Sequence, residues 1–251
     1  MNMILIIYIF LLGLIIGSFL NVVVYRLPEK ESIIKPGSHC PQCNTKLKAI
    51  DLIPVVSFVI NGGKCRYCGA SISWQYPFVE LLTAFFFLGA YLKFGLSVEL
   101  FIILLLLSAL IVISFIDYQY MIIPNVITYS GIIIGLLSAI FFDYISIFSS
   151  LLGIVIPALI LLVIALIFKG GMGMGDVKLA SMLGAFLGTT YTLAGIFIGS
   201  LLGSIIGLSL MVLGVLDRKD RIPFGPFICF GAVIMIFFGE FLINWYVSLF
   251  L

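Results

Sequence analysis

Apolar residues along this chain form long runs rather than the alternating patterns of soluble helices and strands. Runs of about 17 to 25 apolar residues are long enough to cross a bilayer as helices. We predict such helices near residues 3–25, 76–94, 98–116, 125–142, 147–168, 191–216 and 226–247. A shorter apolar stretch, 177–188, either adds an eighth crossing or forms a re-entrant segment, which would leave the chain ends on opposite sides of the membrane. The predicted fold class is an all-α polytopic membrane protein with about eight transmembrane helices.

The composition supports this fold class, since 63% of the 251 residues are hydrophobic and only 10% are charged. Such values exclude an ordinary soluble domain. The first apolar run has no basic start and no small-residue cleavage site before Arg26, so we expect residues 1–25 to be a retained transmembrane helix rather than a signal peptide.

Basic residues predict the orientation of the chain, because cytoplasmic loops of membrane proteins are enriched in Lys and Arg. With eight alternating crossings, twelve of the thirteen Lys and Arg residues fall on one face and only Lys93 falls on the other. These twelve are Arg26, Lys30, Lys35, Lys46, Lys48, Lys64, Arg66, Lys169, Lys178, Arg218, Lys219 and Arg221. We therefore expect the crowded face to be cytoplasmic, both termini to lie outside, and Asp143 to lie in an outer loop.

One polar segment, residues 26–75, interrupts the apolar pattern and is here called the cysteine module. It divides the chain into three predicted parts: a first transmembrane helix (1–25), a cytoplasmic module (26–75) and a transmembrane domain (76–251). An apolar patch within the module, Leu52–Ile60, is too short to span a bilayer and contains Pro54. We expect this patch to form a small core or an interfacial dip.

The cysteine module carries two C-x-x-C pairs, formed by Cys40 with Cys43 and by Cys65 with Cys68. Two residues between paired cysteines allow both thiolates to bind one metal ion, and four thiolates complete a closed tetrahedral Zn²⁺ site of structural type. A module of about 50 residues buries little apolar surface, so metal binding could supply most of its folding free energy. Disulfides are the alternative, which a reducing cytoplasm disfavours.

Two acidic residues, Asp117 and Asp176, stand at the ends of otherwise uncharged apolar runs. A charged side chain costs about 2.5 to 3.5 kcal/mol at the bilayer centre, so aspartates within membrane segments usually carry function. The eight-crossing arrangement places both at the cytoplasmic face. Two carboxylates that meet cannot both ionise, so one keeps a proton and polarises a carbonyl while the other activates water. The pair therefore predicts acid/base catalysis.

Residues beside the two aspartates favour the same chemistry. Gly173 and Gly175 leave the backbone accessible, with room for a substrate strand, at the start of a helix whose dipole stabilises a negative charge. Pro124 predicts a helix break after Asp117, and non-helical backbone at membrane depth lines either protein or a water-filled cavity. Lys178 is either an interfacial anchor or a residue of the site.

Two other classes of protein share parts of this pattern. An ion-coupled transporter also uses paired intramembrane carboxylates, but its site lies near the midplane between repeated halves, which we do not find in this sequence. A membrane-anchored scaffold would use its zinc module for partner binding and would leave the aspartate segments unexplained. Metal-dependent proteolysis is disfavoured because the sequence has no His-Glu-x-x-His.

Several motifs together resemble those of the bacterial type IV prepilin peptidases, which are bifunctional membrane aspartyl proteases. They are Gly-x-Gly-Asp at 173–176, Asp117 followed by five residues and Ile-Pro at 123–124, the two C-x-x-C pairs, the segments 17–22 and 25–28, and Ile-Pro-Phe-Gly-Pro at 222–226. The resemblance extends over nearly the whole chain in matching order. One departure is Gln-Tyr-Pro at 75–77, where the family usually has Arg-Tyr-Pro.

The resemblance implies that Asp117 and Asp176 form the catalytic pair, which removes the basic leader of type IV prepilins and pseudopilins at the cytoplasmic face of the bacterial inner membrane. It further implies methylation of the new N-terminus with S-adenosylmethionine, in a region for which Asn21, Arg26 and Glu80 are candidates. Glu80 is alternatively an interfacial residue favoured by the dipole at a helix start. The implied cofactors are structural Zn²⁺ and S-adenosylmethionine, and the implied partners are these substrates and membrane lipid, with no nucleic acid.

Overall fold

The computed structural model describes residues 3–142, 144–168, 172–215, 217, 220 and 222–249. Most of these residues are helical, and the described part of the chain contains two isolated β-bridges but no strand. The chain divides inside one helix into two compact units, Met1–Val112 and Ile113–Leu251. The division of the sequence into residues 1–25, 26–75 and 76–251 stays a prediction.

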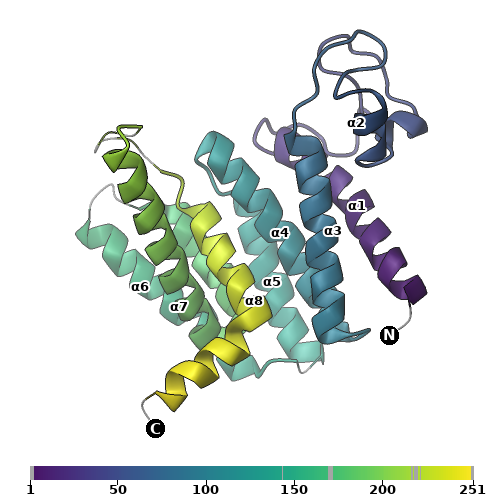
Figure 1. Cartoon of the computed structure of the whole chain (residues 1–251). Helices are drawn as coiled ribbons and strands as arrows, with labels where there is room; N and C mark the ends of the chain where they lie inside the picture. The colour runs from purple at the N-terminus through teal and green to yellow at the C-terminus, as the bar shows by residue number, and fades with distance from the viewer. Residues whose placement is uncertain are drawn as a thin grey trace. The chain divides into compact units, whose positions relative to one another are not determined.

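Seven of the described helices are long and apolar enough to cross a membrane, as Figure 1 shows. They are α1 (Met3–Arg26), α3 (Gln75–Phe94), α4 (Val98–Tyr120), α5 (Asn125–Phe142), α6 (Ile147–Ile167), α7 (Met174–Val212) and α8 (Gly225–Ser248). The predicted all-α membrane fold class is confirmed. Its boundaries change mainly at two places: α4 extends four residues beyond the predicted end at 116, and the predicted runs 177–188 and 191–216 merge in the single element α7, which ends at Val212.

Helix α7 consists of two arms joined at Gly188, whose φ of 71° and ψ of 179° are not helical. The first arm runs parallel to α5, because Gly131 lies against Met182 and Gly135 lies against Ala185. Glycines at these positions allow the helices to approach closely. The first arm therefore leads away from the end of α4 that carries Asp117.

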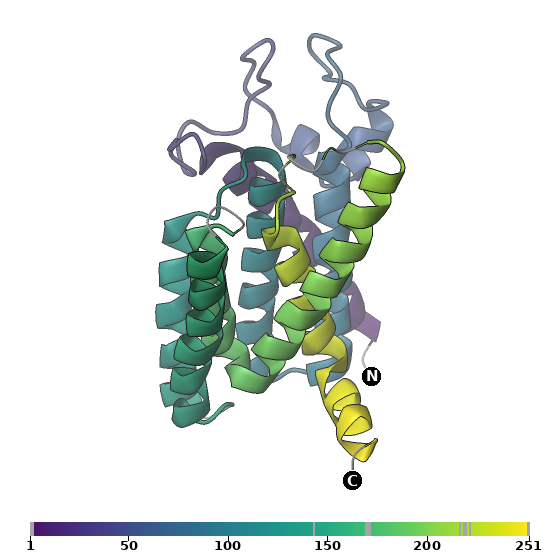
Figure 2. The ribbon, with the colours of Figure 1, turned by 90° about the vertical axis from the view of Figure 1, so that its left-hand side faces the viewer.

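The second arm of α7 returns toward that end. It packs antiparallel to α8, with Gly195 against Gly231 and Gly199 against Phe227, and α8 begins beside Asp117. Figure 2 shows this arm, in bright green, rising from the turn between the two arms. The eight-crossing prediction requires the two arms to run in opposite directions, as they do. That the short first arm crosses the membrane stays a prediction.

In the first unit, α1 and α3 pack antiparallel through small residues. Gly13 lies against Ala84, and Gly17 lies against Glu80 and Thr83. The end of α1 and the start of α3 therefore lie together, and the cysteine module joins them there, as Figure 1 shows. The module contains a 3₁₀ turn, η1 (Ala49–Leu52), and a short helix, α2 (Val56–Ile60).

Several residues that carry the predicted orientation lie outside the described part of the chain. They are Asp143, Lys169, Arg218, Lys219 and Arg221. The cytoplasmic position of the basic loops, and the outer position of both termini, stay predictions.

Candidate active site and metal centre

Asp117 lies in the last turn of α4, where its side chain is buried. Its Oδ2 accepts a hydrogen bond of 2.9 Å from the backbone N–H of Gly225, the first residue of α8. The helix ends three residues later, and Met121 adopts a left-handed φ of 54°. The predicted helix break between Asp117 and Asn125 is therefore present, and Pro124 precedes the first residue of α5.

Asp176 is the third residue of α7 and is also buried. Its Oδ2 accepts a hydrogen bond of 3.2 Å from the backbone N–H of Gly173, which caps the helix start. The positive end of the helix dipole stabilises the charge of a carboxylate at this position. The predicted placement of Asp176 at a helix start is therefore confirmed.

Gly175 joins the two aspartate motifs. A Cβ at this position would lie 3.0 Å from Cβ of Ile123, so only glycine fits without displacement of the break that follows α4. The first turn of α7 and the non-helical segment 121–124 are consequently neighbours. Asp117 lies close enough to Asp176 for the two buried carboxylates to interact electrostatically.

Lys178 contacts α5 in the described structure. Its Nζ donates a hydrogen bond of 2.8 Å to Oδ1 of Asn125 and lies 5.4 Å from the centroid of the Tyr129 ring. These contacts tie the first turn of α7 to the first turns of α5. Lys178 therefore supports the position of Asp176 from the neighbouring helix.

The four module cysteines form one cluster. The Sγ atoms of Cys40, Cys43, Cys65 and Cys68 all lie within 4.8 Å of one another. Tetrahedral zinc with Zn–S bonds of about 2.3 Å requires S–S separations of about 3.8 Å, so the cluster has the donors and nearly the size of such a site. All four cysteines are free, and the Cys40 and Cys68 sulfurs are 3.9 Å apart, well beyond the length of a disulfide bond.

The two C-x-x-C pairs have the same backbone geometry. In the first turn, Cys40 N–H bonds to Thr45 O and Asn44 N–H bonds to Cys40 O, at 3.0 and 2.8 Å. In the second turn, Cys65 N–H bonds to Ala70 O and Gly69 N–H bonds to Cys65 O, at 2.7 and 2.9 Å. Asn44 and Gly69 both have positive φ, which lets each turn close behind its second cysteine.

Thiol ionisation differs within the cluster, since the pKa of the Cys68 thiol is raised to about 12. Hydrogen bonds with the hydroxyl and backbone of Thr45 lower the pKa of the Cys43 thiol to about 6. The thiolate is the form of cysteine that binds a metal ion.

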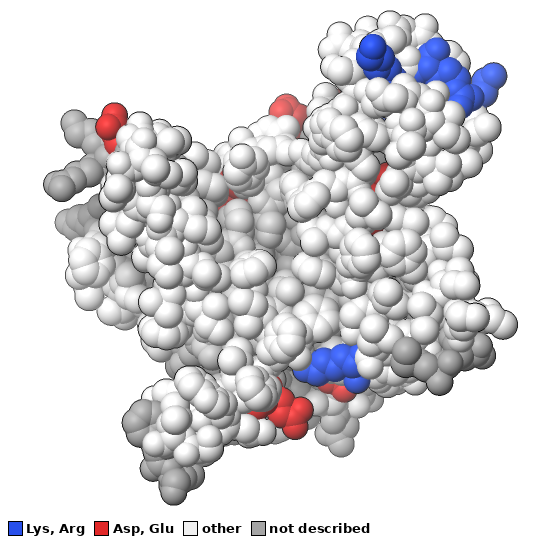
Figure 3. All heavy atoms as spheres, in the orientation of Figure 1, with Lys and Arg blue, Asp and Glu red and all other residues white. Residues whose placement is uncertain are grey.

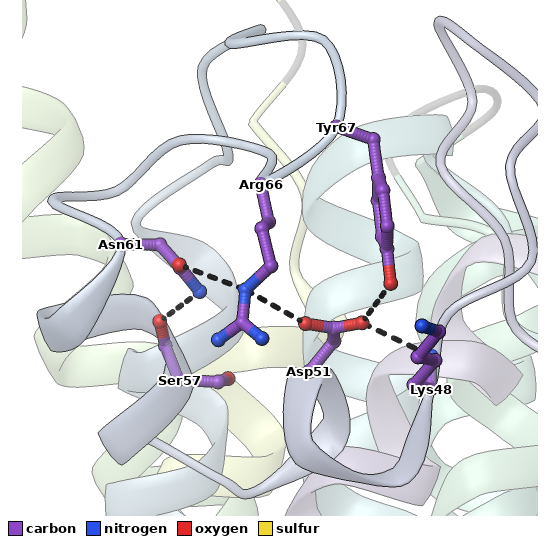
Figure 4. Close-up of polar contacts among 6 residues, drawn as sticks. All are labelled: Lys48, Asp51, Ser57, Asn61, Arg66 and Tyr67. Atoms are coloured by element: carbon purple, nitrogen blue, oxygen red, sulfur yellow. Dashed lines mark hydrogen bonds and ion pairs between the residues drawn. The ribbon is translucent and has the colours of Figure 1, made fainter.

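Asp51 connects the second C-x-x-C turn to η1, as Figure 4 shows. Its Oδ2 accepts hydrogen bonds from the Tyr67 hydroxyl at 2.8 Å and from Lys48 N–H at 3.0 Å, while Oδ1 lies 3.3 Å from Arg66 Nε. The Tyr67 hydrogen bond, the largest influence, lowers the pKa of the Asp51 carboxyl. Asp51 therefore favours its charged form. The charged carboxylate orients Arg66 and Tyr67, the two residues between the cysteines of the second C-x-x-C turn.

Two family models together match most of the chain. The bacterial peptidase A24 N-terminal domain matches residues 11–94, and the type IV leader peptidase family matches residues 104–208. The chain belongs to the type IV leader peptidase family. Its membrane helices and its family make it an integral membrane protein.

Three curated relatives match this chain over most of their own length. A Bacillus subtilis protein named prepilin leader peptidase/N-methyltransferase is 37% identical, covering 96% of this chain and 97% of its own. Proteins of the same name from Pseudomonas aeruginosa and Legionella pneumophila are 35% and 34% identical, covering 92% and 95% of this chain and 89% and 93% of their own. No solved structure matches. Nothing in these comparisons supports an ion-coupled transporter.

The three candidates for methyl transfer all lie in the first unit of this family member. The Arg26 guanidinium is buried and donates to the backbone carbonyls of Ser32, Pro36 and Gly37 at 3.0, 2.8 and 3.5 Å. These bonds fix the loop that follows α1. The Arg26 guanidinium therefore binds the backbone of its own module.

Asn21 and Glu80 form a buried polar pair of α1 and α3. Asn21 Nδ2 donates to Tyr76 O at 3.1 Å, whereas its buried Oδ1 has no hydrogen-bond partner. Glu80 Oε2 accepts a hydrogen bond of 2.7 Å from Val55 N–H. Gly17, one turn before Asn21, lies against Glu80, so both side chains occupy one small region.

Gly225 is a site residue whose role sequence reasoning missed. Its motif was noticed only as part of the resemblance, and nothing local indicates that its N–H meets Asp117. The available signal was a glycine between two prolines at the start of an apolar run. This pattern predicts a backbone turn that leaves an N–H free to bond to another segment.

Proposed function

We propose that this protein cleaves the leader peptide of type IV prepilins and pseudopilins, with Asp117 and Asp176 as its catalytic pair. The observation that carries the proposal is the proximity of two buried carboxylates, one at the end of α4 and one at the start of α7, in a chain of the type IV leader peptidase family. The curated relatives carry the name prepilin leader peptidase.

The site suits hydrolysis by an activated water molecule. Each aspartate has one oxygen, Oδ2, held by a backbone N–H, which fixes the orientation of the carboxylate. With one proton shared by the pair, one carboxylate takes a proton from water while the other donates a hydrogen bond to the scissile carbonyl oxygen. The hydroxyl of water bonds to the carbonyl carbon, and the C–N bond then breaks as the leaving amine gains a proton. The titration belongs to the pair rather than to either residue.

The cytoplasmic face of the inner membrane is the proposed place of cleavage. The uneven distribution of Lys and Arg supports it, since the positive-inside rule puts the crowded face in the cytoplasm. Both aspartates then open toward the cytoplasm, and both termini lie outside.

The four-cysteine cluster is the proposed site of one structural Zn²⁺ ion. Cys40, Cys43, Cys65 and Cys68 would all be ligands, which leaves no position for a reactive water. Zinc would then stabilise the fold of the module without entering the hydrolytic chemistry.

Methylation of the new N-terminus is the proposed second activity, and the relatives' name N-methyltransferase supports it. When bound, S-adenosylmethionine supplies the methyl group to the amine, which loses a proton. The unpartnered Oδ1 of Asn21 and the carboxylate of Glu80 are acceptors that suit its ammonium and hydroxyl donors. Arg26 would support this region through the loop that it holds.

The test uses the purified protein reconstituted in vesicles, with a full-length prepilin and S-adenosylmethionine, and reads product masses. We expect a shortened pilin and then a further mass gain of one methyl group. A prepilin whose mass never changes would refute the peptidase, and a shortened pilin without methylation would refute only the second activity.

A further inference from the structure

The cysteine module exposes an apolar face that its own core does not use. Phe58 is buried and packs edge-on against the Trp74 ring at a centroid distance of 4.8 Å. Around this contact, Val59, Ile60 and Trp74 are 68%, 71% and 77% exposed. Ile53 and Val56 are 44% and 48% exposed, so the short segment 53–60 and Trp74 together present five large apolar side chains that the described residues cover only in part.

The position of this face along α3 is set by one hydrogen bond. Val55 N–H, at the start of α2, donates to Oε2 of Glu80 at 2.7 Å. Glu80 is five residues beyond Gln75, the first residue of α3, which is about 7.5 Å along the helix axis. The start of α2 is therefore level with the second turn of a membrane-spanning helix, rather than beyond its end.

A depth of this size matches the interfacial layer of a bilayer. Apolar faces of interfacial helices are buried about 5 to 10 Å into the boundary between headgroups and acyl chains. Trp74 and Tyr76, at the start of α3, are of the residue types enriched at that boundary. Phe78, in the first turn of α3, is also exposed.

Charge favours lipid over other occupants of this face. Exposed lysines of the module are Lys30, Lys35, Lys46, Lys48 and Lys64. Figure 3 shows Lys and Arg side chains gathered at the outer end of the module on the face turned to the viewer. An apolar face on a module that carries several exposed lysines is a composition that binds anionic membrane surfaces.

We propose that residues 53–60, together with Trp74, insert into the headgroup region of the membrane leaflet on the side of the module. Ile53, Val56, Val59 and Ile60 contact lipid there, and the Val55–Glu80 hydrogen bond holds the segment at that depth. The two C-x-x-C turns remain in water, because they lie beyond η1 and α2 in Figure 1 and Figure 2. Lipid contact then sets the height of the cysteine module above the membrane.

The test places single tryptophans on the full-length protein. Trp74→Phe and Trp245→Phe together remove both native tryptophans. Val59→Trp is then compared with Gln42→Trp, an exposed position between Cys40 and Cys43. Both variants are reconstituted in vesicles of phosphatidylcholine and phosphatidylglycerol, and retention of four protected thiols verifies that the module is folded.

We expect lipids brominated near the headgroup to quench Val59→Trp, with blue-shifted emission and little quenching by aqueous acrylamide. Gln42→Trp should show the reverse. Equal acrylamide quenching of both positions would overturn the proposal, because the face would then be in water. Protection of Val59→Trp from both quenchers would also overturn it, since a protein partner or a second copy would then cover the face.

Discussion

The backbone N–H of Gly225 donates a hydrogen bond of 2.9 Å to Oδ2 of Asp117, a residue 108 positions earlier in the chain. The bond orients a buried carboxylate with a backbone donor, which every substitution at position 225 except proline retains. Gly173 makes the same kind of bond to Asp176, so backbone donors hold both members of the proposed catalytic pair.

Gly225→Ala should abolish most leader cleavage. A Cβ at this position would lie 2.7 Å from Oδ2 of Asp117, so the carboxylate must turn or the start of α8 must shift. Cleavage rates of protein inserted in vesicles measure the effect, and misplacement by about 1 Å can cost roughly a hundredfold. Gly37→Ala is the matched control, because a Cβ there meets only Lys46 Cε at 3.8 Å. Equal rates for both variants would contradict the positioning role of Gly225.

Asp117→Asn and Asp176→Asn should each lower cleavage by at least about a hundredfold, since each keeps the shape of the side chain but removes a titrating group. Initial rates of leader removal, with binding of prepilin measured separately, check this outcome. Glu240→Gln, which changes an exposed carboxylate of α8, should leave the rate near that of the unmodified protein. Substantial cleavage by either asparagine variant would rule out the pair as the catalytic machinery.

Gly175→Ala should reduce cleavage more than Gly173→Ala. A Cβ at Gly175 would lie 3.0 Å from Ile123 Cβ, whereas a Cβ at Gly173 would meet nothing closer than Oδ2 of Asp176 at 3.6 Å. The first change pushes the start of α7 away from the break beside Asp117. Single-turnover rates of the two variants test the order, and the reverse order would show that the contact with Ile123 does not position the site.

Removal of zinc should unfold the cysteine module before the transmembrane helices. Metal binding is worth about 10 to 16 kcal/mol in zinc-finger peptides and could supply most of the module's folding free energy. A chelator, or Cys40→Ser with Cys43→Ser, should lower methylation further than cleavage, as read from product masses. A zinc-free protein that is still inserted in the membrane could keep normal methyltransferase activity but lose all cleavage. That result would show that the two activities had been assigned to the wrong parts of the chain.

Asp51→Asn should weaken zinc retention by roughly tenfold, the lower range for residues that orient metal ligands. The change removes the charge that faces Arg66 and weakens the acceptor for Tyr67. Folding lowers the pKa of Asp51, so its contribution is present above the ordinary carboxyl pKa of about 3.9 and is lost as pH falls through the folded-state value. Competition with a chelator at neutral pH measures the loss, and Glu31→Gln, at an exposed position, is the control. Unchanged retention would show that Asp51 does not support the metal centre.

Features that depend on neighbouring residues were predictable from the sequence. The length of an apolar run decides whether a helix can cross the bilayer, and the predicted helices are present in the described structure. The spacing within each cysteine pair is also local, and the four sulfurs cluster as expected. Asp117 and Asp176 were recognisable because a carboxylate is costly beside lipid and both stand at helix ends.

Contacts between distant segments were decided by the tertiary structure alone. In a chain with 25 glycines, the sequence does not indicate that Gly188 reverses the direction of α7 or that Gly175 contacts Ile123. Nor does it indicate that the N–H of Gly225 donates a hydrogen bond to Asp117. The bonds from Arg26, a candidate for methyl transfer, to the carbonyls of its own loop were likewise not indicated by the sequence. A backbone donor or acceptor has the same chemistry in every residue, so its partner depends on which helices pack together, and that choice belongs to the fold as a whole.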